Sequence, residues 1–268
     1  MNHLLRDLAP ISDAAWAQID EEATRTLTQF LAARRLVDFE GPLGWTHSAV
    51  DLGRIVPAEA PAVPGVEVAR RRVQPLVELR ARFALDRSEL DAIARGAADP
   101  DLQPVIDAAR VAALAEDRIV FHGDPADGTT GIIAASPHPT VPVDDDFARY
   151  PDHAAAAAAA LRGAGIGGPF AIALGTGAYG GVMVATEQGG YPVVELLRQI
   201  LGGPAVWAPA IDGAVVLSQR GGDFRLTVGQ DLSVGFRSAS DDAVELYIQE
   251  SIAFRVITPE AAVQLAPA

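Results

Sequence analysis

The stretch WTHSAVDLGRIVPAEAPAVPGVEVARRRVQPLVELRARFAL, residues 45–85, has the least ordinary pattern in this chain. Two β-like pieces, at 48–56 and 66–73, flank a proline-rich tip, PAEAPAVPG, at 57–65. Proline fixes φ and lacks an amide donor, so the tip forms neither a helix nor a central strand. Because these residues include too little apolar material for a core, the stretch predicts either a mobile surface hairpin or an arm that becomes ordered on a neighbouring subunit.

The sequence around this loop alternates between helical and strand patterns. Apolar and polar residues alternate from 77 to 85, which predicts a long strand with one solvent-facing side. Apolar residues at helical spacing predict helices at about 12–33 and 102–121. An α/β region follows at about 147–211, and Asp-Gly at 212–213 is a turn signal that predicts a hairpin. The chain therefore belongs to the α+β class.

Composition excludes several classes of protein. The chain has 268 residues, 35 acidic and 21 basic side chains and a formal net charge of −14, and every base is arginine. A chain that coats nucleic acid needs basic density to neutralise phosphates, so no nucleic-acid partner is expected. No apolar run is long enough to span a membrane, and the N-terminus shows no export signal. The absence of cysteine excludes disulfides, cysteine-ligated zinc and a thiol nucleophile.

No motif in the sequence argues for catalysis. Gly175, Gly177 and Gly180 form G-x-G-x-x-G after a predicted strand, but no run of βαβ units surrounds them. Thr176 serves equally well as the N-cap of the next helix. The acidic run 144–146 lacks the spacing of a calcium loop and is interpreted as a solvated charge run. We therefore expect neither an enzyme nor a metal site.

Six stretches carry a resemblance to a known family. They are LLRDLAPIS (4–12), EDRIVFHG (116–123), WAPAIDGAVVL (207–217), RGGDF (220–224), GQDLSVGF (229–236) and LYIQESIAF (246–254). They span almost the whole chain in the family's order. The chain resembles the family 1 encapsulins, or linocin-type proteins, which have the HK97-type fold of phage capsids.

The resemblance implies a fold with five parts. These are an N-terminal arm and helix (1–44) in the peripheral domain, an extended loop (45–75), the rest of the peripheral domain with its spine helix (76–130), an axial domain (131–220), and a returning β-ribbon of the peripheral domain (221–268). It also implies a shell subunit that self-assembles into an icosahedral nanocompartment in the bacterial cytoplasm. Such shells enclose a cargo enzyme by its C-terminal targeting peptide. The cargo is often a dye-decolourising peroxidase or a ferritin-like protein, which links the shell to oxidative stress or iron storage.

The resemblance also implies two sites. The cargo peptide is expected in an apolar groove at Phe30, Arg34, Leu36, Asp38, Asp231, Leu232 and Val234, although the apolar members suit a plain core equally well. A pore loop is expected at Glu187, Gln188, Gly189, Gly190 and Tyr191, where a ring of Glu187 side chains would favour cations. Some relatives carry a flavin stacked on a tryptophan near 86–95. That position here is close to Ser88, with no tryptophan nearby, so no cofactor is expected.

Two other functions stay open from the residues alone. Linocin-type proteins have been labelled as secreted antibacterial proteins or proteases, but no signal segment or catalytic motif supports that label here. A phage-derived major capsid protein is the other alternative. Its N-terminal assembly segment is often long and basic, whereas the arm here has about a dozen residues with Arg6 as its lone full cation. The arm therefore gives no support for DNA packaging.

Overall fold

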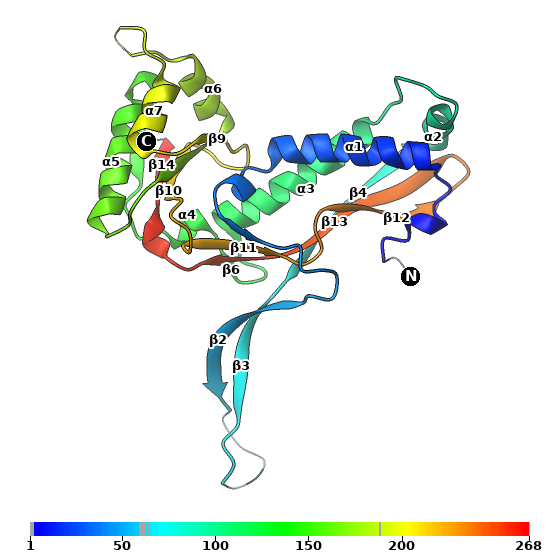
Figure 1. The fold of residues 1–268 in the computed structure, drawn as a ribbon, viewed down its shortest axis with the longest axis horizontal. Helices are drawn as coiled ribbons and strands as arrows, with labels where there is room; N and C mark the ends of the chain where they lie inside the picture. The colour runs from blue at the N-terminus through cyan, green and yellow to red at the C-terminus, as the bar shows by residue number, and fades with distance from the viewer. Residues whose placement is uncertain (1–2, 59–62, 64, 188, 268) are drawn as a thin grey trace.

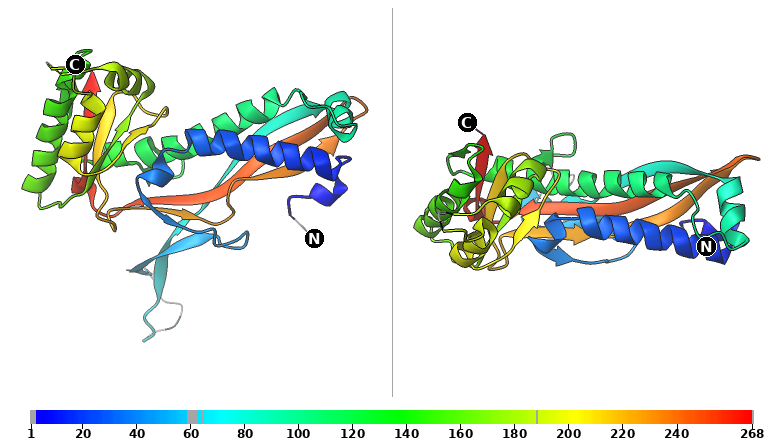
Figure 2. Two further views of the ribbon diagram at one scale, coloured as in Figure 1. Left: turned by 45° about the horizontal axis from the view of Figure 1, so that its top comes forward. Right: turned by 90° about the horizontal axis from the view of Figure 1, so that it is seen from above.

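The computed structural model describes residues 3–58, 63, 65–187 and 189–267. Figure 1 shows an elongated domain, a compact domain beside it, and a two-stranded ribbon that projects away from both. We call these the peripheral domain, the axial domain and the ribbon. The left view of Figure 2 shows the ribbon projecting from the same side of the molecule after a 45° turn.

A five-stranded sheet forms the peripheral domain. Its strands are β1 (Asp38–Glu40), β4 (Val77–Asp86), β11 (Phe224–Val228), β12 (Ser233–Ala239) and β13 (Ala243–Val256). The long β13 is central: β4 pairs along one edge, while β12 and β11 share the other. β4 has the predicted alternation, with more exposed residues at every second position. Its side chains follow the period of a strand that covers a core with one face.

Two long helices lie along the peripheral sheet. The helices of this domain are α1 (Asp13–Phe30), α2 (Arg87–Ala94) and α3 (Gln103–His122), with single 3-10 turns η1 (Arg6–Leu8) and η2 (Ala33–Arg35). Ser12 caps α1 by accepting the Ala15 amide. The buried stripe of α1 faces α3, and both helices close a core of small and aliphatic side chains over β4, β12 and β13. This core holds the peripheral domain together.

The axial domain is a second five-stranded sheet with its own helices. The strands are β7 (Val141–Val143), β14 (Ala262–Pro267), β10 (Ala214–Ser218), β8 (Phe170–Leu174) and β9 (Ala205–Trp207), in that order. The helices are α4 (Ile132–Ala135), α5 (Tyr150–Gly163), α6 (Thr176–Val184) and α7 (Val193–Leu201), with the turns η3 (Phe147–Arg149) and η4 (Pro259–Ala261). Every residue of β8 and β10 is buried. This larger core also takes in the ends of α3 and β13, so it ties the two domains together.

The predicted hairpin at 212–213 is wrong. β9 and β10 lie on opposite sides of β8, with β9 parallel to β8 and β10 antiparallel to it. The Asp-Gly turn instead carries the chain past β8, and Gly213 has a left-handed φ of 71°. A Cβ at that glycine would meet the Leu265 carbonyl oxygen at 2.3 Å, so close packing against β14 also requires glycine.

The predicted assignment of residues 221–268 to the peripheral domain does not hold for the last strand, β14. β14 pairs with β10 and β7, so it belongs to the axial sheet and not to a peripheral β-ribbon. The chain passes from the peripheral to the axial sheet between β13 and β14, and β14 lies between β7 and β10. The G-x-G-x-x-G motif also takes a different role. Gly175, and not Thr176 as expected, is the N-cap of α6, beside a sheet that mixes parallel and antiparallel pairs.

The ribbon consists of β2 (Ala49–Pro57) and β3 (Ala69–Pro75), which pair only with each other. This confirms the two predicted β-like pieces. Most residues of both strands are exposed, and no buried core forms around them. The small strands β5 (Gly123–Asp124) and β6 (Thr129–Thr130) make a hairpin at the end of α3. No helix in the described part of the chain is long and apolar enough to cross a membrane.

Candidate functional site

Arg34 occupies the junction between α1, α3 and the peripheral sheet. Its Nε donates to both carboxylate oxygens of Glu116 at 2.9 Å. One terminal nitrogen donates to Asp231 at 2.8 Å, and the other reaches Glu250 at 3.2 Å. The planar guanidinium can hold several acceptors at fixed angles, so one side chain connects three segments. We call Arg34, Glu116, Asp231 and Glu250 the Arg34 junction.

The junction holds charge in a dry environment. The side chains of Glu116 and Glu250 are fully buried. Burial raises the pKa of Glu250 well above its ordinary value, and the neighbouring Glu116 carboxylate raises it further. Burial alone would lower the pKa of Arg34, but the hydrogen bond and charge of Glu116 raise it. Burial and the neighbouring Glu116 carboxylate thus oppose ionisation of Glu250, whereas Glu116 favours the charged form of Arg34.

Asp117 fixes the turn that brings Arg34 to the junction. Its two carboxylate oxygens accept the amides of Ala32 and Ala33 at 3.0 and 2.9 Å. Burial raises the pKa of Asp117 to about 7, although both backbone hydrogen bonds act in the opposite direction. The carboxyl group thus satisfies backbone donors left free at the start of η2, directly after α1, and it holds η2 against α3.

The seven residues predicted to bind a cargo peptide lie in different environments. Arg34 and Asp231 come together as an ion pair, as described. Phe30 and Leu232 are half-buried and pack against the peripheral core. Leu36 and Val234 are only 3% and 4% exposed, and they belong to the axial and peripheral cores respectively.

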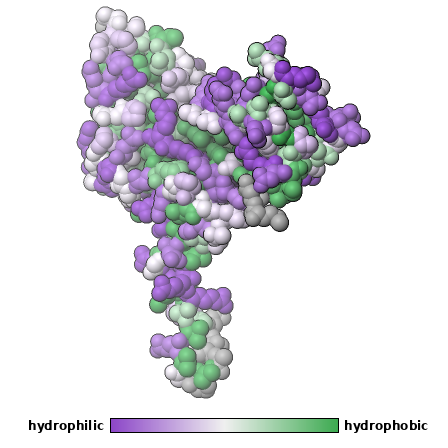
Figure 3. Space-filling model, turned by 45° about the vertical axis from the view of Figure 1, so that its right-hand side comes forward, coloured by the Kyte–Doolittle hydropathy of each residue, from purple (hydrophilic) through white to green (hydrophobic). Residues whose placement is uncertain are grey.

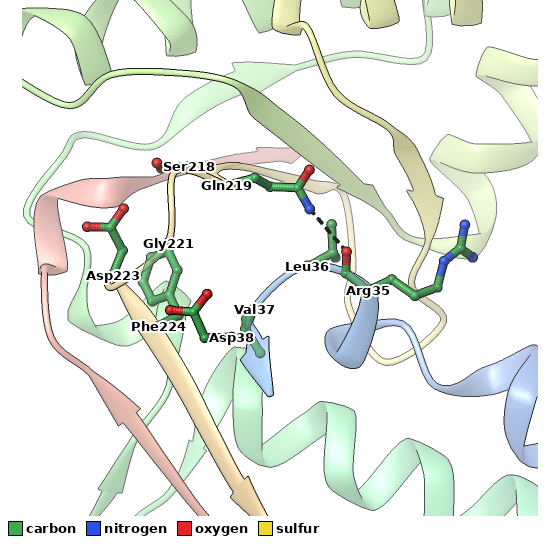
Figure 4. A pocket seen from close by; sticks show the side chains of 9 residues that line it. All are labelled: Arg35, Leu36, Val37, Asp38, Ser218, Gln219, Gly221, Asp223 and Phe224. Atoms are coloured by element: carbon green, nitrogen blue, oxygen red, sulfur yellow. Dashed lines mark hydrogen bonds between the residues drawn. The ribbon is translucent and has the colours of Figure 1, made fainter. Parts of the chain in front are cut away.

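Leu36 and Asp38 line a small pocket between the two domains (Figure 4). Its volume is about 100 Å³, room for a few water molecules and too little for a peptide. Asp38 accepts the Gly222 amide at 2.6 Å, and Gln219 donates to the Arg35 carbonyl oxygen at 3.0 Å. The Arg35 guanidinium points away from the pocket in Figure 4. These contacts join the start of β1 to the chain between β10 and β11.

The surroundings of Phe30 include residues that sequence reasoning missed. Trp207 of the axial domain packs at a tilt against the Phe30 ring, with centroids 5.2 Å apart. The Arg110 guanidinium lies 5.4 Å from the centroid of the same ring. On the other side of the junction, Arg34 lies 5.1 Å from the ring centroid of Phe39, which is 39% exposed. Aromatic rings and cations thus surround the end of α1.

Glu116 and Asp117 were also missed, although the sequence contained a signal for them. Both lie in the buried register of α3, one turn before Val120 and one turn after Ala112 and Ala113. A charged residue on the apolar face of a helix requires a buried partner. The pattern could have shown that a cation reaches α3, but not that the cation is Arg34.

The predicted pore loop connects α6 to α7 at the outer end of the axial domain (Figure 1). The Glu187 amide donates to the Tyr191 carbonyl oxygen at 2.9 Å, and this hydrogen bond joins the two ends of the loop. Gly189 and Gly190 have φ values of 119° and 82°, a region that favours glycine. Glu187 and Tyr191 are exposed, and Gln188 lies outside the described residues. The loop is therefore a tight turn that presents one carboxylate to solvent.

The described residues offer no other obvious chemistry. No group of three or more acidic or histidine side chains among them has the geometry to hold a metal ion. Ser88 is exposed on α2, and this helix, RSELDAIA, has no aromatic ring on which a flavin could stack.

Solved structures define the class of fold. A virus-like particle from Pyrococcus furiosus matches with a TM-score of 0.60 at 18% identity, covering 92% of this chain and 98% of that chain. The capsid of an empty GTA particle matches with a TM-score of 0.52 at 16% identity, covering 89% of this chain and 96% of that chain. The chain therefore has the HK97-type capsid fold, as predicted from the sequence.

Sequence comparisons define the family. Residues 1–253 match the family described as "Encapsulating protein for peroxidase". The type 1 encapsulin shell protein of Rhodospirillum rubrum is 53% identical over 270 residues, 99% of this chain and 96% of the relative. That of Mycobacterium tuberculosis is 43% identical over 265 residues, 99% of both chains. This chain belongs to the type 1 encapsulin shell protein family, so it is a shell subunit and not an enzyme.

Proposed function

We propose that this shell subunit assembles into an icosahedral compartment in the cytoplasm and binds the C-terminal peptide of a cargo enzyme. The observation that carries the cargo proposal is the pair of half-buried apolar side chains beside the Arg34 junction. Phe30 lies four residues before Arg34, and Leu232 directly follows Asp231, whose carboxylate also accepts the Leu232 amide at 2.8 Å. The ion pair thus places two apolar side chains at the end of α1 without burying them completely.

Such a surface suits an extended peptide. Half-buried apolar side chains provide shallow pockets, while Phe39 and Arg110 add an exposed ring and a cation at the edges. Leu36 and Val234 are buried in the axial and peripheral cores respectively, so they are not exposed to such a peptide. The family description, an encapsulating protein for peroxidase, supports a peroxidase as cargo, and the resemblance described above points to one of the dye-decolourising type. A ferritin-like protein is the second candidate, on the resemblance alone.

The two remaining parts of the proposal concern entry and assembly. The α6–α7 loop presents the exposed Glu187 carboxylate, and a ring of such carboxylates at a symmetry axis would admit cations more readily than anions. The ribbon clasps a neighbouring subunit, which would cover the apolar side chains that it exposes as a single chain. Ile55 is 69% exposed and Val56 is 48% exposed.

Replacement of Leu232 tests the cargo surface. We expect Leu232→Asp to lower the loading of a co-expressed peroxidase with a C-terminal tail by about tenfold or more, because a charge replaces an apolar contact. Leu232→Met is the matched control and should load normally. Loading is measured as cargo that sediments with intact shells, and a tail-less peroxidase sets the background. Normal loading of intact Leu232→Asp shells would remove this residue from the cargo surface.

A further inference from the structure

The two strands of the ribbon concentrate positive charge in an acidic chain. β2 and β3 together hold four arginines and one aspartate, whereas the whole chain has a net charge of −14. Arg54 pairs directly with Arg72, and Val56 pairs with Arg70. Since residues two apart along a strand share a face, Arg54, Arg70 and Arg72 lie on one face with Val56. We call this the arginine face.

The opposite face of the ribbon has a different composition. Ile55 pairs with Arg71 there, and Pro57 pairs with Ala69. Arg71 is therefore the one arginine of β2 and β3 that points away from the arginine face. It provides a natural control, because it is exposed on the same strand as Arg70 and Arg72.

The arginine face is unfavourable in an isolated subunit. Like charges directly opposite each other destabilise an antiparallel pair. Arg54, Arg70 and Arg72 are exposed, and none of them forms an ion pair with another described residue. Among the described residues the ribbon has no buried core to offset this repulsion, and Figure 3 shows it as a narrow projecting stem. Two-stranded ribbons are marginal in water even without such repulsion.

We propose that the arginine face docks on an acidic surface of a second copy of this chain. The inference rests on the proposed clasp, and it assigns the face of the ribbon and the chemistry of its partner. Acidic surface is abundant on each copy: Glu21, Asp99 and Asp101, for example, line one hollow between α1 and the segment before α3. Copies with a net charge of −14 repel each other on average, so assembly requires a local attraction of opposite sign.

The apolar neighbours of the arginines favour a protein partner over a polyanion. Val56 shares the arginine face, and Val68, whose carbonyl oxygen accepts the Ala58 amide, continues the ribbon toward its tip. Val56 is 48% exposed and Val68 is 46% exposed. Apolar side chains between cations gain from contact with a protein surface and gain little from phosphates. Binding of nucleic acid to the arginine face is therefore the alternative that the experiment below can detect.

Four variants test the proposal in the full-length protein. Arg54→Gln/Arg70→Gln/Arg72→Gln neutralises the arginine face, and the corresponding triple lysine variant keeps its charge. Arg82→Gln/Arg95→Gln/Arg118→Gln removes three exposed arginines outside the ribbon and gives the same net charge as the first variant. Arg71→Gln changes the opposite face. Each protein is assembled at several NaCl concentrations, and the assembled fraction is measured by sedimentation, with far-UV circular dichroism to check the fold.

We expect the ribbon triple-glutamine variant to need about tenfold more subunit for half-assembly at low salt, because each exposed ion pair contributes roughly two- to fivefold. Wild-type assembly should weaken as NaCl rises, and the variant should depend less on salt. The lysine variant and Arg71→Gln should assemble like wild type.

Four results would overturn the proposal. They are assembly of the ribbon triple-glutamine variant like wild type, loss of assembly by the lysine variant, an equal loss by the Arg82/Arg95/Arg118 variant, and nucleic acid that co-purifies with wild type but not with the ribbon triple-glutamine variant. If wild type itself forms no shells at any salt concentration, the shell function fails instead, and the two failures are distinguishable.

Discussion

Arg34 and the arginines of the ribbon have the same side chain in opposite surroundings. The Arg34 guanidinium contacts three carboxylates, two of them fully buried. Arg54, Arg70 and Arg72 are exposed, and two of them lie directly opposite each other. At the Arg34 junction the charged side chains have partners within the same chain. These three arginines of the ribbon have no ion-pair partner among the described residues. The difference distinguishes the part of the subunit whose charges are compensated within one chain from the part that we propose contacts a second copy.

The same contrast exists in the apolar residues. The axial core contains fully buried aromatic side chains such as Phe121 and Phe170, and it extends into the peripheral domain. The ribbon instead exposes Ile55, Val56 and Val68. Burial of a large side chain contributes about a few kcal/mol to folding, so the two domains are stabilised by their cores. The described part of the ribbon lacks this contribution, and little stabilises its conformation in an isolated subunit.

The largest effect is expected from truncation of a core ring. Phe121→Ala should lower the free energy of unfolding by about 3–5 kcal/mol, because a fully buried ring is replaced by a cavity. Ile55→Ala should leave the secondary structure unchanged and lower only the assembled fraction. Guanidinium unfolding followed by circular dichroism measures the first effect, and sedimentation measures the second. Unfolded subunits of Ile55→Ala would contradict the contrast between domains and ribbon.

Removal of the junction cation should have an effect of similar or slightly smaller size. Arg34→Met leaves Glu116 buried without its cation, and we expect a loss of about 3–5 kcal/mol in the free energy of unfolding. Arg237→Met is the matched control, because Arg237 and Glu245 are both about half exposed, at 49% and 47%. That pair should contribute about 1 kcal/mol or less. Equal losses of unfolding free energy for Arg34→Met and Arg237→Met, measured by urea unfolding, would show that the Arg34 junction stabilises the fold no more than an exposed ion pair.

The smallest effect concerns the pH dependence of Asp117. Its pKa is about 7 in the folded protein, against an ordinary value of 3.8 in the unfolded chain. Between these values the folded state binds a proton that the unfolded state releases, so this group makes stability fall as pH rises from about 4 to about 7. Below pH 4 both states are protonated, and above pH 7 the decline from this group is complete.

Asp117→Asn should remove this decline. The asparagine keeps one oxygen for the two amides of Ala32 and Ala33, so we also expect a loss of about 1–3 kcal/mol at pH 5. Urea unfolding at pH 5 and pH 8 compares the two proteins, and wild type should lose more stability between these values than the variant. Because Glu250 is present in both proteins, the difference isolates Asp117. Identical pH profiles would contradict the assignment.

Much of this molecule was predictable because its signals are local. The alternation at 77–85 depends only on neighbouring residues, and it became β4 with the expected exposed face. The prolines at 57, 61 and 64 exclude a central strand wherever the chain places them. Six short stretches of sequence also carry the resemblance to the family to which the chain belongs. Residue types and their order are sufficient for such conclusions.

The site was less predictable because its contacts join distant residues. Arg34 meets Glu116, Asp231 and Glu250 across 82, 197 and 216 positions of the chain. The sequence placed Arg34 and Asp231 at one site only through the resemblance, and it gave no indication that Arg34 would be held by buried glutamates. Leu36 and Val234 have the composition of groove residues and of core residues alike, and their burial follows from packing.

By itself, the sequence determined the α+β class, the two β-like pieces of the ribbon, the family and the absence of cysteine chemistry, since each depends on composition or short-range pattern. Only the tertiary structure decided that β14 returns to the axial sheet, that Asp-Gly at 212–213 does not form a hairpin, and that three ribbon arginines share one face. Strand order and register depend on which edges are free when the domains pack. No local pattern contains that information.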